Sequence, residues 1–79
     1  MSPEEIIRRL LAWATAQAKA DGKTPDVIPA ICEVATGLKG QSIVAWAKLV
    51  RKGAPLPRFQ ARTINALQAW SDKHPEVVA

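Results

Sequence analysis

The chain of 79 residues contains one Cys, one His and no Tyr, and these shortages exclude several classes of protein. A lone Cys32 cannot form a disulfide within the chain, which favours a reducing compartment such as the cytoplasm. A structural metal site needs several Cys or His ligands, and a catalytic thiol needs a base that the distant His74 does not supply. Glycine-rich phosphate-binding motifs are also missing. We therefore expect no enzymatic activity, no metal and no cofactor.

Long apolar runs are missing as well. No segment approaches the roughly 20 residues that a membrane-spanning helix requires. The N-terminus carries Glu4 and Glu5, whereas a signal peptide would begin with basic residues. At 48% hydrophobic residues the chain is apolar enough to fold. These features predict one domain over residues 1–79, in the cytoplasm and not in a membrane.

The most informative absence is that of Asp and Glu between Val34 and Ser71, where no acidic residue occurs. The basic residues of this stretch are Lys39, Lys48, Arg51, Lys52, Arg58 and Arg62. With a net charge of +4, the chain favours an acidic partner. Nucleic acid is the commonest such partner, which would place the protein at the nucleoid, and an acidic protein is the other.

Apolar spacing predicts an all-α fold, and its first two helices have clear signals. The first runs from Pro3 to about Ala20, because Pro suits the first position and acids follow it. The second runs over residues 27–36. We prefer Asp26 to Thr24 as its N-cap, since Pro29 then falls in the first turn and costs no hydrogen bond.

Two further helices complete the predicted four-helix domain. The third begins near residues 40–42 and ends at Gly53, and the fourth takes Pro57 as its first residue and runs to about Lys73. His74 follows as a helix-end residue. Three indoles lie on apolar stripes, and we expect them to share one core: Trp13, Trp46 and Trp70.

A glycine turn connects the second and third predicted helices, and the residues after it are regularly spaced. A hydrophobic residue follows the glycine, with an aliphatic residue six positions after it and a Trp nine after it; these are Gly37, Leu38, Ile43 and Trp46. With this spacing, residues 27–52 resemble the helix-turn-helix of the Cro/lambda-repressor-like family, which occurs in phage and plasmid regulators. Glu33 and Lys39 depart from the small residue and the capping Ser that the family favours there.

The resemblance implies a transcriptional regulator that binds duplex DNA, with residues 41–52 as the recognition helix in the major groove. Gln41 can pair with adenine, Lys48 can donate to guanine, and Val44 or Ala45 can touch a thymine methyl. Arg58 and Arg62 are expected at the start of the fourth helix, where they can contact phosphate. The full set of expected DNA contacts is Lys39, Gln41, Ser42, Val44, Ala45, Lys48, Arg51, Lys52, Arg58 and Arg62.

The resemblance also implies a homodimer on DNA, for which Leu56 and Val77–Val78 are candidate contact residues. Two other functions fit the same basic face. One is a protein-interaction module, such as a phage-type inhibitor or antitoxin, that binds an acidic protein. The other is an RNA-binding helical domain, although a recognition helix does not fit the narrow major groove of A-form RNA. The plainest reading is a solvated basic surface.

Overall fold

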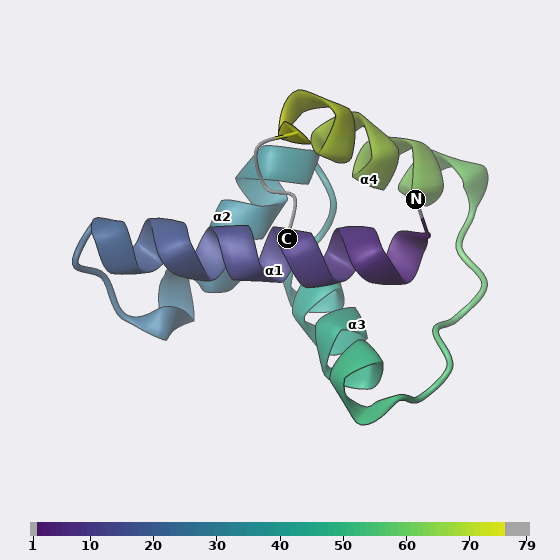
Figure 1. Ribbon diagram of the computed structural model, residues 1–79, viewed down its shortest axis with the longest axis horizontal. Helices are drawn as coiled ribbons and strands as arrows, with labels where there is room; N and C mark the ends of the chain where they lie inside the picture. Colours follow the sequence, from purple (N-terminus) through teal and green to yellow (C-terminus); the bar gives the residue numbers. More distant parts are fainter. Residues whose placement is uncertain (1, 76–79) are drawn as a thin grey trace.

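The computed structural model describes residues 2–75, which form four α-helices and no strand. They are α1 (Pro3–Ala20), α2 (Ile28–Thr36), α3 (Gly40–Lys52) and α4 (Ala61–Lys73), and a short 3-10 helix, η1 (Pro25–Val27), precedes α2. In Figure 1, α1 crosses in front of α2 and α3, and α4 lies along one side. Both α1 and α2 contact each of the other three α-helices, so these two helices hold the bundle together. The prediction of an all-α, four-helix domain is confirmed.

The first helix has the predicted ends. The Glu5 backbone N–H donates to the Ser2 hydroxyl (N···O 3.4 Å), which caps one of the free donors at the start of α1. The helix ends at Ala20, and Gly22 follows with a φ of 67°, a left-handed conformation that glycine adopts without strain. The sequence therefore determines both ends of α1 through local interactions.

The start of α2 differs from the prediction. Pro25–Val27 form the 3-10 turn η1, and Val27, not Asp26, is the N-cap residue of α2, without a side-chain hydrogen bond. The Asp26 carboxylate instead accepts a hydrogen bond from the Thr24 hydroxyl. Pro29 does fall in the first turn of α2, as expected. Two prolines in five residues explain the difference, because a tight turn loses few hydrogen bonds where N–H groups are missing.

Side chains from α2 hold the turn between α2 and α3. Gly37 ends α2 with a φ of 75°, and the Leu38 N–H donates to the Thr36 hydroxyl (N···O 3.1 Å). The Gly40 N–H, at the first position of α3, donates to Oε1 of Glu33 (N···O 3.0 Å). Lys39, the N-cap residue of α3, contributes no side-chain bond. The carboxylate of the preceding helix therefore supplies the cap that the turn itself lacks.

Glu33→Ala is expected to lower the free energy of unfolding by about 1 kcal/mol, because it leaves the Gly40 N–H without its partner. Glu33→Gln keeps an acceptor oxygen at the same place and should cost less. Urea unfolding followed by circular dichroism measures both. Equal stability of the wild type and the Ala variant would show that this bond does not cap α3.

The fourth helix begins later than predicted. Its first residue is Ala61 rather than Pro57, and Gln60 is its N-cap residue. In the preceding segment Leu56 and Phe59 pack against the core, and the rings of Phe59 and Trp46 meet edge to face, with centroids 4.7 Å apart. This segment is not helical, and burial of the two side chains offsets the loss of one helical turn.

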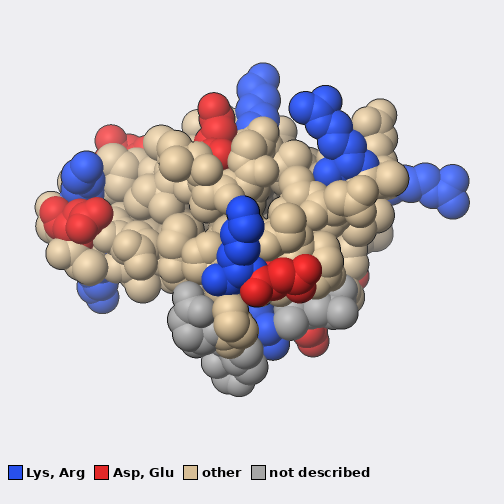
Figure 2. Space-filling model, turned by 90° about the horizontal axis from the view of Figure 1, so that it is seen from above, with Lys and Arg blue, Asp and Glu red and all other residues tan. Residues whose placement is uncertain are grey.

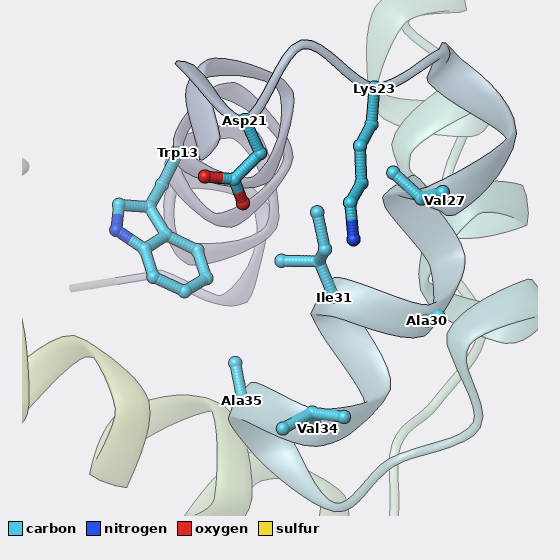
Figure 3. A pocket seen from close by; sticks show the side chains of 8 residues that line it. All are labelled: Trp13, Asp21, Lys23, Val27, Ala30, Ile31, Val34 and Ala35. Atoms are coloured by element: carbon cyan, nitrogen blue, oxygen red, sulfur yellow. The ribbon is translucent and has the colours of Figure 1, made fainter. Parts of the chain in front are cut away.

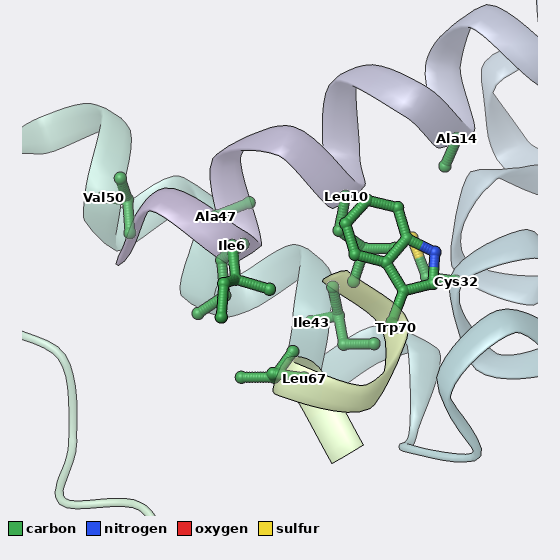
Figure 4. Close-up of a cluster of buried hydrophobic side chains, with 10 residues drawn as sticks. Ile6, Leu10, Ala14, Cys32, Ile43, Ala47, Val50, Leu67 and Trp70 are labelled. Carbon is green, nitrogen blue, oxygen red and sulfur yellow. The ribbon is translucent and has the colours of Figure 1, made fainter. Parts of the chain in front are cut away.

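The core collects the inward stripes of all four helices (Figure 4). Its buried members are Ile6, Ile7, Leu10, Ala14, Cys32, Ile43, Ala47, Val50, Leu67 and Trp70. Trp70 is 2% exposed, whereas Trp13 and Trp46 are half-buried and pack against this core. Trp13 also meets Trp70 edge to face, with ring centroids 5.7 Å apart. All three indoles therefore belong to one core, and Trp70 is the most deeply buried.

Candidate nucleic-acid interface

One side of α3 faces solvent along its whole length. The residues of this outward stripe are Gln41, Ala45, Lys48 and Lys52, and all four are exposed. Their spacing of four, three and four places them on one side of the helix. Ile43, Ala47 and Val50 occupy the opposite side and are buried. Core packing therefore fixes which way the outward stripe points, and the stripe contains no acidic side chain.

A groove runs beside the outward stripe, between α3, α1 and η1. From α3 it is lined by Gln41, Val44, Lys48 and Arg51, and its volume is about 360 Å³. Leu11 and Thr15 of α1 form the facing wall with residues of η1, among them Asp26. The structure thus brings four of the predicted DNA contacts together and adds a carboxylate to them.

A second hollow of about 360 Å³ lies at the start of α3 and is bordered by Asp26, Glu33 and Gln41. The acid-free stretch of the sequence is therefore not acid-free in space. The two carboxylates come from η1 and α2, which fold back beside α3. Separation along the sequence does not predict that these two carboxylates lie near Gln41, because their position depends on how the helices pack.

The remaining predicted contacts lie outside the groove. Lys39 is exposed in the turn before α3, Ser42 is half-buried, and Lys52 is exposed in the last turn. Arg51 and Lys52 lie at the C-terminus of α3, where positive charge also complements the helix dipole. That interaction alone accounts for two cations at this end of the helix.

Arg58 and Arg62 are not at equivalent places. Arg62 is the second residue of α4, near free backbone N–H groups, since Gln60 makes no side-chain cap. Arg58 precedes the helix, which corrects the prediction that it belongs to the first turn. It lines a separate hollow that also includes Glu4 of α1. Figure 2 shows Lys and Arg projecting from several sides of the molecule, with Asp and Glu among them. The predicted cations therefore do not line one common groove.

Cys32 is buried, and the His74 ring is already engaged by Trp70. Burial raises the pKa of the Cys32 thiol to about 11, so its thiolate is scarce at neutral pH. His74 is the C-cap residue of α4; its Nδ1 lies 2.9 Å from the Trp70 carbonyl oxygen, and its ring stacks on the Trp70 indole. Across residues 2–75, no three His, Cys, Asp or Glu side chains gather as metal ligands would. In the same part of the chain, no helix has both the length and the apolar character for a membrane span.

Comparison of the chain with protein-family models, with curated proteins and with solved structures gives no match. The similarity to the Cro/lambda-repressor-like family therefore remains a prediction based on residue spacing.

Sequence reasoning missed one surface, an apolar groove between α1 and α2 (Figure 3). Val34 on this surface is 88% exposed, and the other exposed large hydrophobic residue within residues 2–75 is Ile64, at 42%. A helical projection of α2 contains the signal. Cys32 is buried, and a residue two positions further lies on the far side of the same helix.

Proposed function

We propose that the protein is a sequence-specific transcriptional regulator that binds duplex DNA. In this proposal α2 and α3 act as a helix-turn-helix, and α3 enters the major groove. The observation that carries the proposal is the acid-free outward stripe of α3, held in place by a fully buried opposite side. A helix that contacts base edges needs a rigidly held surface with polar or basic side chains and without acidic ones.

The outward stripe offers the chemistry of base recognition. The Gln41 amide both donates and accepts, which matches the N6 and N7 edge of adenine, and the Lys48 ammonium matches the acceptors of guanine. Ala45 and the neighbouring Val44 are small enough to approach a thymine methyl. Gln41 lies in the first turn of α3, the end of a recognition helix that usually contacts base edges.

Phosphate contacts are assigned to cations around the outward stripe. Lys39 in the turn and Arg51 and Lys52 in the last turn can reach the strands that border the groove. Asp26 and Glu33 lie beside Gln41 and repel phosphate, so we expect the backbone contacts to concentrate toward Lys52. Arg62 at the start of α4 adds a contact that carries no sequence information, and Arg58, on its separate hollow, can contribute only at the edge of the DNA.

The test compares one reading residue with one positioning residue. Gln41→Ala should cost about 1–3 kcal/mol on the preferred site and little on random duplex, because only the specific site offers the adenine edge. Arg62→Ala should weaken both duplexes alike and reduce the salt slope by about one unit. The preferred site comes from selection out of a random DNA pool. Both variants are then titrated against that site and against random DNA at several salt concentrations.

If Gln41→Ala weakens both duplexes equally, or neither, then α3 does not read bases in this way. A protein-interaction module would then become the better proposal, and one observation favours it specifically. The groove beside α3 combines Lys48 and Arg51 with Asp26 and with the apolar Leu11 and Val44. Mixed charge around an apolar floor suits a protein surface better than a phosphate backbone.

A further inference from the structure

The apolar groove between α1 and α2 is open and has a volume of about 400 Å³. Trp13 of α1 forms one wall, and Ile31 and Ala35 of α2 face it (Figure 3). Trp13 and Ile31 are half-buried, so part of each still faces solvent. Val34 borders the same groove and is 88% exposed, which makes it a protruding aliphatic side chain beside a recess. The same surface therefore carries a protruding side chain and a recess beside it.

The charges on this groove are balanced. Of its lining residues only Asp21 and Lys23 are charged, and they carry opposite signs. Both reach from the loop after α1 toward the groove (Figure 3). The whole chain has a net charge of +4, so two copies repel each other over most approaches. A face with one acid and one base lacks this repulsion and can pair with itself.

We propose that this groove is the contact face of a homodimer. In it, Val34 of each copy packs beside Trp13 and Ile31 of the other, and Lys23 of each copy pairs with Asp21 of the other. A twofold interface requires a self-complementary patch, and this face offers a protruding Val34 beside a recess and one charge of each sign. A different protein could bind by filling the recess alone. A second copy also uses the protruding Val34 and the opposite charges of Asp21 and Lys23.

The face replaces the dimer contacts suggested by the sequence. Leu56 packs against the core, is half-buried and does not line this groove. Val77–Val78 lie outside the described residues. Val34 and Ala30 also border the hollow beside Gln41, so the dimer face adjoins the candidate DNA-binding surface. The two proposals are nevertheless independent, because dimerisation can be measured without DNA.

The first experiment is sedimentation equilibrium of the wild type, Val34→Asp and Ile64→Asp. A buried, unpaired carboxylate should weaken the dimer at least about tenfold in Val34→Asp. Ile64 is also exposed but lies on α4, away from the groove, so Ile64→Asp should dimerise as the wild type does. Circular dichroism checks that both variants fold. A wild type that stays monomeric up to about 1 mM, where association is weaker than about 4 kcal/mol, would overturn the proposal. So would a Val34→Asp variant that still dimerises normally.

The second experiment exchanges the two charges. Asp21→Lys and Lys23→Asp should each weaken the dimer, although they change the net charge in opposite directions. The double variant Asp21→Lys/Lys23→Asp restores both pairs across the twofold axis and should recover most of the lost affinity. Failure of the double variant to recover it would exclude the reciprocal pairing. Duplex binding by the monomeric Val34→Asp variant on a half-site then tests the DNA proposal separately.

Discussion

Gly40→Ala is expected to destabilise the protein by about 3 kcal/mol or more, although Ala is the better helix former by about 1 kcal/mol. Gly40 is buried at the first position of α3, directly against α2. A Cβ on Gly40 would overlap the backbone carbonyl of Pro29, whose carbon would lie only 2.6 Å away. That neighbour is main chain and cannot rotate out of the way. The two helices would have to separate.

The matched control is Gly53→Ala at the other end of α3. Gly53 has a φ of 72° and no atom near the position of a Cβ, so only backbone strain opposes the change. We expect a loss of about 1 kcal/mol, as for other left-handed positions. Urea unfolding by circular dichroism compares the two variants. A Gly40→Ala protein as stable as the wild type would show that α2 and α3 pack less closely than the structure indicates.

The affinity for duplex DNA is expected to fall about 100-fold between 50 and 200 mM salt, as four phosphate contacts per chain would require. The counterions released on binding account for this dependence, and the cations assigned to it are Lys39, Arg51, Lys52 and Arg62. Lys52→Ala should reduce the slope of log affinity against log salt by about one unit. Lys19→Ala, at the end of α1, is the control and should leave the slope unchanged.

Fluorescence anisotropy with a labelled duplex measures these slopes, and a structured RNA serves as the competing ligand. Absence of duplex binding at 50 mM salt would remove the DNA proposal. A flat salt dependence with a protein partner would favour the interaction module. Preference for the RNA would contradict the placement of α3 in a major groove, which A-form helices make too narrow.

The sequence predicted the elements whose signals are local. Pro3 marks the start of α1, and Gly37 and Gly53 end α2 and α3 at the expected positions, each with a left-handed φ. The prediction that α4 begins at Pro57 was wrong, because the fixed φ of proline suits an extended chain as well as a first helical turn. The choice depended on the burial of Phe59 against Trp46, a contact between distant segments.

The candidate site was predictable only in part, for the same reason. The apolar stripe of Ile43, Ala47 and Val50 identified which side of α3 is buried, and hence which side is exposed. The approach of Asp26 and Glu33 to Gln41 depends on how η1 and α2 pack, and no spacing within α3 encodes it. The acid-free stretch was therefore a correct property of the sequence and an incomplete description of the surface.

Because Glu33 accepts the hydrogen bond from the Gly40 N–H, the residue at position 39 does not have to cap α3. Most helices depend on the residue just before them for their cap, so that residue is limited to a few types. Here a side chain seven residues upstream supplies the acceptor, and exposed Lys39 makes no side-chain cap. Substitutions at position 39 can therefore alter the charge or reach of the turn while the start of α3 keeps its cap.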